Sequence, residues 1–338
     1  MLNKAVINLH TIKENALAIK NFINGQAKFC AVVKADAYGH GGVMVANAIY
    51  TIVDSYAVAT CEEGIELRLS GIDKDILVLI PPRKEDLPRA ILYGLTFTAL
   101  NKVQIDLIGD MAHSLGLSAK VHVKFDTGMN RLGVSDLKGL RQITEYSLLK
   151  KGIILDGAYS HLGELQNKKE LKSSVDKFLL ANNLIKGYNN INCHISASGG
   201  LLKGIKSDTF RVGILLYGYK PFNCSKIKVC PAMKVYSPII DKRQVSKGQR
   251  ILYGDNRLEK DAFATLVQYG YADGLDRAKV GDLLNNRCMN ISAYSSIVEK
   301  DGYALIMDDA DKLARQYNTI SYEILTKSAI TAQKIYLK

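Results

Sequence analysis

The chain has 338 residues, of which 47% are hydrophobic and 23% charged, and its formal net charge is +12 at pH 7. This composition predicts a folded globular protein with room for two domains. The lysines are scattered rather than gathered in a basic tract with aromatics, which argues against nucleic-acid binding. No apolar run has the length of a membrane span, and the first residues contain no long apolar stretch, so we expect a cytoplasmic protein.

Strand-like and helix-like segments alternate through the first two thirds of the chain. Short apolar runs rich in β-branched residues predict strands at 28–33, 55–59, 76–80, 95–98, 120–125, 153–159, 191–196 and 208–215. Amphipathic stretches predict helices at 11–23, 42–52, 61–70, 101–115, 137–149 and 168–185. Thr11 and Glu14 have capping-box spacing, so we expect the first helix to begin at Thr11. This α/β alternation predicts a TIM-type (β/α)8 barrel over 10–222, although doubly wound sheets share it.

The pattern changes after about residue 222. Apolar runs predict further strands at 228–239, 250–253, 262–270, 287–298 and 303–307, with a helix near 309–317. These segments predict a smaller, mainly β C-terminal domain over 223–338. The opening segment 4–9 also reads as a strand, and we expect residues 1–9 to pair with this later domain rather than with the barrel.

The cysteines and histidines indicate no metal site. The six cysteines have no zinc-ligand spacing, and several lie inside apolar runs, so we expect reduced thiols in a reducing compartment. The six histidines show no motif such as H-E-x-x-H. A metal cofactor is therefore not expected.

Lys34 is the most informative single residue. It follows the apolar run Phe29–Val33, at the carboxyl end of the first predicted barrel strand, and glycines at 39, 41 and 42 supply a turn after it. Burial disfavours the ammonium form, so a lysine held there can lose its proton and attack a carbonyl carbon. By itself, a lysine at a strand end can also simply point into solvent.

Polar, charged or glycine residues stand at the carboxyl ends of five predicted barrel strands, where barrel active sites gather. They are Lys34 and Tyr38, the segment 124–133, the segment 159–161, the segment 196–200 and the segment 211–214. The glycine-containing turns after the seventh and eighth strands lie where barrels commonly bind phosphate. Each piece alone has a structural explanation, but their common placement predicts a site. No Gly-x-Ser-x-Gly elbow supports a serine nucleophile.

Four motifs carry a resemblance to a known family. The string from Ala31 to Gly41 resembles the pyridoxal-phosphate (PLP) lysine signature of bacterial alanine racemases. The segment 124–134 is similar to the family's K-x-D-T-G-M-x-R-L-G-V motif, 269–274 to its G-Y-A-D-G motif, and 318–325 to its closing segment. The motifs occur in the family's order and span almost the whole chain. The resemblance implies a two-domain, fold-type III PLP enzyme.

The resemblance also implies roles for the matching residues. Lys34 would hold PLP covalently and act as one acid/base, while Tyr271 would act on the opposite face, reaching in from the partner subunit. Arg211 would contact the pyridine nitrogen, with His161 bonded behind it to orient it. The phosphate would be held by Tyr38, Ser198, Gly213, Ile214 and Tyr322.

Substrate contacts follow from the same matches. Arg131 and the backbone at Met289 would bind the substrate carboxylate, and Lys124 is a possible carbamylated lysine that positions the arginine. Because Lys34 and Tyr271 belong to different domains, a homodimer with shared active sites is implied.

The chemistry explains why two such bases are needed. Racemisation removes the α-proton from one face of an amino acid and returns it from the other, which requires an acid/base group on each face. A phenol has a pKa of about 10, so a tyrosine base needs a nearby positive charge. Arg131 and His161 are the candidates for that influence.

Two departures from the family pattern concern the substrate pocket. Arg287-Cys288-Met289-Asn290 is tighter than the family's arginine, two residues, then Met-Asp, and Asn290 replaces the acidic residue. The preceding loop, 278–286, is also short for the family. These differences leave serine or a broader range of amino acids open as alternative substrates.

Other function classes remain as rivals. A PLP-carrying homeostasis protein without turnover would be a single-domain barrel, and a fold-type III decarboxylase would be longer, with a catalytic cysteine motif that is not found here. The favoured interpretation is an isomerase that converts L-alanine to D-alanine for peptidoglycan, acting as a cytoplasmic homodimer.

Overall fold

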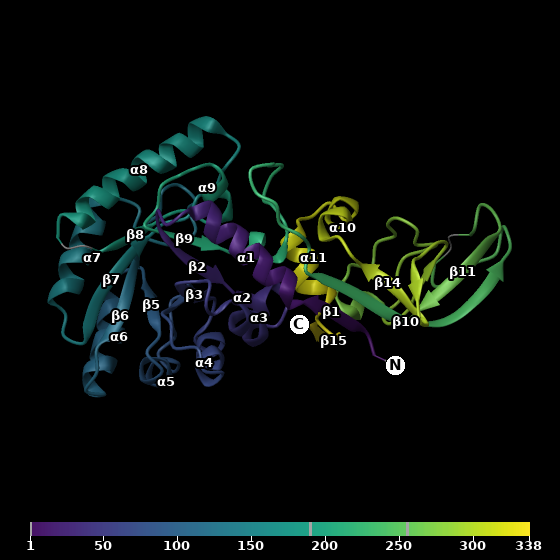
Figure 1. The fold of residues 1–338 in the computed structure, drawn as a ribbon, viewed down its shortest axis with the longest axis horizontal. Helices are drawn as coiled ribbons and strands as arrows, with labels where there is room; N and C mark the ends of the chain where they lie inside the picture. Colours follow the sequence, from purple (N-terminus) through teal and green to yellow (C-terminus); the bar gives the residue numbers. More distant parts are fainter. Residues whose placement is uncertain (1, 189–190, 255–256) are drawn as a thin grey trace.

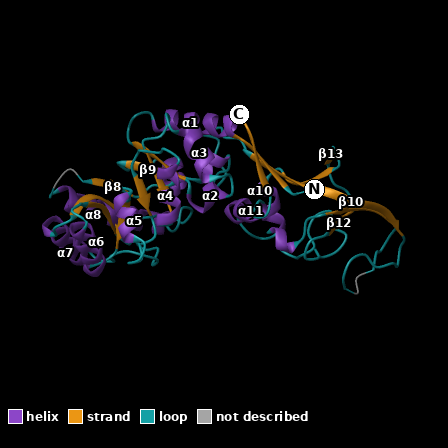
Figure 2. Ribbon diagram, turned by 90° about the horizontal axis from the view of Figure 1, so that it is seen from below, coloured by secondary structure: helices purple, strands orange, loops and turns teal. Residues whose placement is uncertain are grey.

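The structure is a computed structural model that describes residues 2–188, 191–254 and 257–338. It has two regions that differ in architecture, an α/β barrel and a mainly β region, and these are joined side by side (Figure 1). Both chain termini lie near the junction, where the first and last strands run next to each other (Figures 1 and 2). Among the described residues, no helix is both long and apolar enough to cross a membrane.

The barrel is one parallel sheet of eight strands in the order β8-β7-β6-β5-β4-β3-β2-β9. Its strands are β2 (Lys28–Val32), β3 (Ser55–Val58), β4 (Ile76–Val78), β5 (Thr96–Ala99), β6 (Ala119–Lys124), β7 (Ile153–Tyr159), β8 (Asn192–His194) and β9 (Thr209–Val212). An isolated parallel bridge between Ala197 and Arg211 links the two edges, and β9 pairs directly with β2. The predicted (β/α)8 barrel is therefore confirmed, because a doubly wound sheet would leave both edges open.

Helical segments alternate with the strands. They are α1 (Leu9–Ile23), α2 (Lys34–Tyr38), α3 (Gly42–Ile49), α4 (Cys61–Leu69), α5 (Leu87–Leu92), α6 (Lys102–Ser114), α7 (Leu137–Leu149), α8 (Lys168–Lys186), α9 (Ser198–Leu202) and the 3-10 helix η1 (Ile214–Tyr217). Among them, α2, α9 and η1 contribute residues to the cavity at the barrel mouth. The expected start of the first helix at Thr11 is wrong. Asn8 is the N-cap, and its side chain accepts a hydrogen bond from the Thr11 N–H at 2.9 Å. Asparagine is a strong N-cap residue, and it lies just where the preceding strand ends.

The second region is built on a seven-stranded sheet. Its elements are β1 (Lys4–Asn8), β10 (Met233–Val245), β11 (Ala262–Val267), η2 (Tyr271–Asp273), β12 (Ser292–Tyr294), β13 (Glu299–Lys300), β14 (Tyr303–Met307), α10 (Ala310–Gln316), α11 (Ser321–Ser328) and β15 (Gln333–Leu337). The opening strand β1 pairs antiparallel with β10 and parallel with β15.

Several segments of this region differ from the sequence-based expectation. Of the strand expected at 287–298, the structure forms Ser292–Tyr294 (β12). The strand expected at 250–253 is not formed, and Arg250 makes an isolated bridge to Arg257. Helix α11 and strand β15 were not expected, because both are short and the sequence near the end of the chain has no long periodic run.

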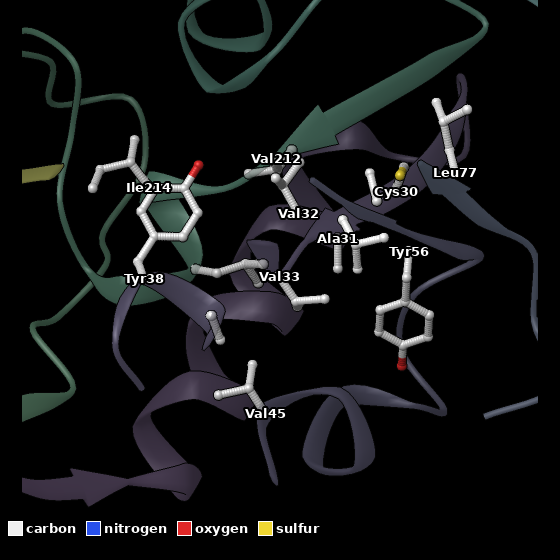
Figure 3. Close-up of a cluster of buried hydrophobic side chains, with 14 of the residues drawn as sticks. Cys30, Ala31, Val32, Val33, Tyr38, Val45, Tyr56, Leu77, Val212 and Ile214 are labelled. Carbon is white, nitrogen blue, oxygen red and sulfur yellow. The ribbon is translucent and has the colours of Figure 1, made fainter. Parts of the chain in front are cut away.

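The barrel core is continuous with the junction. Figure 3 shows Val32 next to Val212, with the ring of Tyr38 beside Ile214. On the other side of the turn, Gly39 has φ +83°, and a Cβ there would lie 2.6 Å from the Leu325 carbonyl oxygen. Glycine thus lets the end of α2 approach α11 closely, and this brings the second region to the mouth of the barrel.

Candidate active site

Lys34 leaves the end of β2 at the start of an unusual turn. The next four residues, Ala35 to Tyr38, all have φ between 51° and 54°, so they form a left-handed turn. This conformation costs L-residues roughly 1–2 kcal/mol each, because Cβ approaches the following carbonyl oxygen. The turn fixes the direction of the chain immediately after the lysine, and both Lys34 and Tyr38 line the same cavity.

That cavity has a volume of about 820 Å³ and opens at the carboxyl ends of the barrel strands. Ten of the predicted site residues line it: Lys34, Tyr38, Lys124, Arg131, His161, Ser198, Arg211, Gly213, Ile214 and Tyr322. Tyr322 comes from α11, so the second region contributes one wall. Of the predicted residues, Tyr271 and Met289 lie outside it.

One end of the cavity suits a phosphate group. The Gly213 N–H lies 3.3 Å from Ser198 Oγ, and the rings of Tyr38 and Tyr322 lie 5.8 Å apart. A Cβ on Gly213 would come within 2.5 Å of the Tyr38 hydroxyl, so only glycine leaves this space open. Burial raises the pKa of Tyr322 to about 12, which keeps its hydroxyl a hydrogen-bond donor. Hydroxyl groups and backbone N–H groups are uncharged hydrogen-bond donors of the kind that bind phosphate in proteins.

Arg211 is buried and reaches the cavity from β9. Its Nη2 donates to the Ser160 carbonyl oxygen at 2.7 Å, and its Nη1 makes a short contact with His194 Nδ1. His194 Nε2 lies 2.9 Å from His122 Nδ1, and His122 Nε2 lies 3.1 Å from Asp156 Oδ2. The arginine has only donors and the carboxylate only acceptors, so each imidazole carries one proton, on Nε2, and donates toward Asp156. We call these four side chains the arginine relay.

The relay adds a second imidazole to one expectation. His161 was expected to be bonded behind Arg211, and its Nδ1 lies 3.5 Å from Arg211 Nη2, but His194 makes a closer contact. His161 also lines the cavity. Burial, followed by the positive charges of Arg211 and Lys124, lowers the pKa of His161 to about 3, so its ring is neutral at physiological pH.

Lys124 is buried at the end of β6 and faces two arginines. Burial, then Arg211 and Arg131, lowers its pKa to about 6, so the amine is largely neutral near pH 7. Its Nζ lies 4.0 Å from the ring centroid of Tyr159, and the Arg211 guanidinium carbon lies 5.0 Å from the same ring. The Tyr159 hydroxyl is 2.8 Å from Thr98 Oγ1, which itself donates to a carbonyl oxygen. The Tyr159 ring thus contacts both the Lys124 amine and the Arg211 guanidinium, and its electron-rich face favours the positive charge of the arginine.

Sequence reasoning assigned no role to His122, His194 or Tyr159. His122 and Lys124 alternate with Val121 and Val123 along β6, so they share one face of the strand. Polar residues at every second position of a barrel strand point into the barrel. That period of two was the signal that could have indicated a buried polar chain.

Tyr271 and Met289 lie together at an exposed edge of the second region. The Tyr271 N–H donates to the Cys288 carbonyl oxygen, and the Ala272 N–H to that of Met289, both at 3.0 Å. A Cβ on Gly270 would come within 2.0 Å of the Met289 carbonyl oxygen, so glycine permits this close approach. Tyr271 is 41% exposed and Met289 56% exposed. The structure therefore brings these two predicted residues together, but away from the cavity of their own chain.

Other features of the site concern metals and thiols. In the described part of the chain, no cluster of three or more histidine, cysteine or carboxylate side chains has the arrangement of a metal site. All six cysteines are free thiols, and burial raises the pKa of Cys30 to about 11.

Comparisons with known proteins agree with this geometry. A family model described as the N-terminal domain of alanine racemase matches residues 7–221, and one described as its C-terminal domain matches 232–336. The chain is 32% identical to alanine racemase 2 of Caldanaerobacter subterraneus, over 98% of this chain and 94% of that protein. Its structure resembles alanine racemase of Clostridium difficile, with a TM-score of 0.92 and 29% identity over 100% and 96% of the chains.

A further solved structure was determined with a ligand. It is the alanine racemase of Bacillus anthracis with bound L-Ala-P, which has a TM-score of 0.88 and 26% identity, covering 99% of this chain and 95% of that one. The likeness extends over both regions of the molecule.

Proposed function

This chain belongs to the alanine racemase family of isomerases, and on that premise we propose that it interconverts L-alanine and D-alanine with PLP held by Lys34. The observation that carries the proposal is that one cavity is lined by Lys34, Arg211, Arg131 and the hydroxyl groups of Tyr38, Ser198 and Tyr322. A lysine, an anion cradle and a buried arginine in one cavity match a cofactor that has an aldehyde, a phosphate and a ring nitrogen.

The residues present fit PLP. Tyr38, Tyr322, Ser198 and the backbone at Gly213 and Ile214 would hold the phosphate. Lys34 would bind the aldehyde carbon, and Arg211 would donate to the pyridine nitrogen. When bound, PLP supplies an electron-withdrawing ring system that makes the α-proton of an attached amino acid easier to remove.

Lys34 and Tyr271 would move the proton. Burial and the charge of Arg131 lower the pKa of Lys34, so its amine can accept a proton as well as donate one. Lys34 Nζ would serve one face of the substrate. The hydroxyl of Tyr271 of the partner subunit would serve the other face, which makes inversion at the α-carbon possible.

Arg211 would decide which reaction follows. Arg211 keeps its own proton, and its partner His194 accepts from it, so Arg211 would donate a hydrogen bond to the pyridine nitrogen without giving up a proton. The bound ring would then be a weaker electron sink, which would favour simple return of the proton to the α-carbon. The relay ends at Asp156, beside a second cavity of about 250 Å³ that Asp54 and Asp75 also line.

Arg131 would bind the substrate carboxylate, together with the backbone at Met289 of the partner subunit. The neutral amine of Lys124 is the form that reacts with carbon dioxide, releasing a proton and forming a carbamate. Such an anion would relieve the crowding of Lys124, Arg131 and Arg211, so we propose that Lys124 is carbamylated.

A homodimer follows from the exposed position of Tyr271 and Met289, because a second copy of the chain is the simplest source of a base for each cavity. We place the boundary between the barrel domain, 10–222, and the C-terminal domain, 223–338 with 1–9, before β10 begins. A cytoplasmic site of action and a supply of D-alanine for peptidoglycan complete the proposal.

A circular-dichroism assay across L-amino acids, on protein whose visible spectrum has been recorded, tests this function. We expect loss of optical activity with L-alanine and a cofactor band. Activity only with serine or other amino acids would overturn the substrate assignment. A cofactor band without turnover of any amino acid would indicate the homeostasis class instead.

A further inference from the structure

The left-handed turn after Lys34 is held at both ends by carboxylates. Four consecutive residues with side chains adopt positive φ there, which L-residues disfavour. Such a turn persists only where its surroundings hold it in place. Asp36, within the turn, accepts from the Gly42 N–H at 2.6 Å and pairs with Lys334 of β15.

The contact nearest to Lys34 comes from Glu63, in the first turn of α4. Glu63 Oε1 accepts from the Ala35 N–H at 2.7 Å, directly after the lysine. Glu63 Oε2 accepts from the Ala59 N–H at 2.7 Å and from the Thr60 N–H at 3.3 Å. One carboxylate thus joins the backbone that follows β2 to the backbone that follows β3, and it uses both of its oxygens.

Glu63 also acts on Lys34 through its charge. Burial and Arg131 lower the pKa of Lys34, and the negative charge of Glu63 opposes that shift. The other titratable or charged groups lining the cavity around Lys34 are Lys124, Arg211, Tyr159, His161, Tyr38, Tyr322 and Glu323. Of these groups and Glu63, only Glu63 is a carboxylate bonded to the backbone next to the lysine.

We propose that Glu63 is a positioning residue for Lys34, fixing the turn behind the lysine and balancing the charge of Arg131 at its amine. The inference rests on the proposed function, in which Lys34 carries the cofactor and moves a proton. Glu63 contacts neither the Lys34 amine nor the cofactor site directly. It acts through its hydrogen bond from the Ala35 N–H and through its negative charge.

The test compares Glu63→Gln with Glu62→Gln in the full-length protein loaded with PLP. Glu62 lies one residue away in the same helical turn but is exposed, so both variants lose one negative charge near the start of α4. Glutamine at 63 can still accept from the Ala35 N–H, but its NH₂ group would face the N–H groups of Ala59 and Thr60. The variant therefore loses both the charge and part of the bridge.

Three measurements are expected to separate the variants. In Glu63→Gln, the pH midpoint of the visible cofactor band moves to lower pH by about one unit, because a cation at the Lys34 nitrogen loses its counter-charge. The value of kcat falls by about tenfold. For the reaction direction in which Lys34 accepts the proton, the acid limb of the kcat–pH profile also moves to lower pH. Hydrogen exchange rises in peptides covering 34–42. Glu62→Gln changes none of these.

Unchanged band titration, pH profile and exchange in Glu63→Gln, with only a lower melting temperature, would overturn the proposal. If Glu63→Gln does not fold, Glu63→Asp decides the question. It keeps the charge but shortens the reach, so exchange must rise while the pH midpoint stays. Failure of the wild-type protein to racemise any amino acid would overturn the proposed function instead, and hydrogen exchange would still test the bridge.

Discussion

The mouth of the barrel and the Tyr271–Met289 edge differ in how complete they are. At the barrel mouth, ten predicted residues surround one cavity, and their partners lie within the same chain. At the edge, Tyr271 and Met289 are held together by backbone hydrogen bonds but face outward. The barrel half of the site can be understood from one chain. In the proposed homodimer, a second copy of the chain would bring the other half to a cavity.

The largest expected effect comes from separating the two halves. Lys34→Ala and Tyr271→Phe should each abolish racemisation, since each removes the acid/base group for one face. Mixed and allowed to exchange subunits, the two inactive proteins should recover about a quarter of wild-type activity. Half of the dimers would then be mixed, and each mixed dimer would hold one intact site of two.

Circular-dichroism assays of each variant alone and of the mixture make this measurement. Lys34→Ala mixed with wild-type protein serves as the control for subunit exchange. A mixture that stays inactive while mass spectrometry detects mixed dimers would contradict the shared site.

The next effect tests the barrel half alone. Arg211→Glu should lower racemisation by about a hundredfold and raise side-transamination relative to it, because a carboxylate allows the pyridine nitrogen to hold a proton. Pyridoxamine phosphate measured by chromatography after turnover gives the ratio. No rise in that ratio would argue against the role of Arg211.

Acid should weaken the barrel more than the second region, because all six histidines lie before residue 222. Burial lowers the pKa of His40 to about 4 and that of His194 well below its usual value. Below pH 6.5 the unfolded chain therefore binds protons that the native state does not, so stability falls as pH falls toward 4. Between pH 7 and pH 5, His40 alone should cost about 2 kcal/mol of unfolding free energy.

Urea unfolding followed by circular dichroism at both pH values measures that loss. His40→Asn keeps a donor for the Ala37 and Tyr38 carbonyl oxygens and should show a smaller difference between pH 7 and pH 5. His113→Gln, at an exposed position, should show the same difference between pH 7 and pH 5 as the wild-type protein. Equal differences in all three proteins would contradict this explanation.

The smallest effect concerns the far end of the arginine relay. Asp156→Asn keeps an oxygen that accepts from His122 but removes the charge, so we expect kcat to fall only about threefold. Asp75→Asn is the matched control, because Asp75 lines the same second cavity as Asp156 but pairs with Lys120. Steady-state kinetics compare the two variants. A larger fall of kcat in Asp75→Asn than in Asp156→Asn would show that the second cavity affects the active site by a route other than the arginine relay.

The predictable parts of the molecule are those with strong local patterns. The barrel strands were found because each is a short buried run, and Lys34 was found because it ends one of them. The arginine relay was not found from the sequence, because its members come from β6, β7, β8 and β9 and meet only inside the closed barrel. His161 was identified because it follows a strand end, where a site residue was expected, whereas His194 was missed because it lies inside the strand expected at 191–196.

Less of the second region could be predicted. Helix α11 has eight residues and strand β15 has five, too few for a clear period. The pairing of β1 with both β10 and β15 depends on contacts far apart in the chain. The motif 269–274 indicated a role for Tyr271, but its exposure became visible only in the folded chain.

Reduction with borohydride, followed by peptide mass mapping, tests the central claim most directly. The account predicts that the peptide containing Lys34 gains the mass of a reduced pyridoxyl phosphate group and that no other lysine does. The added mass on a different lysine, or on none in protein that shows the cofactor band, would contradict it.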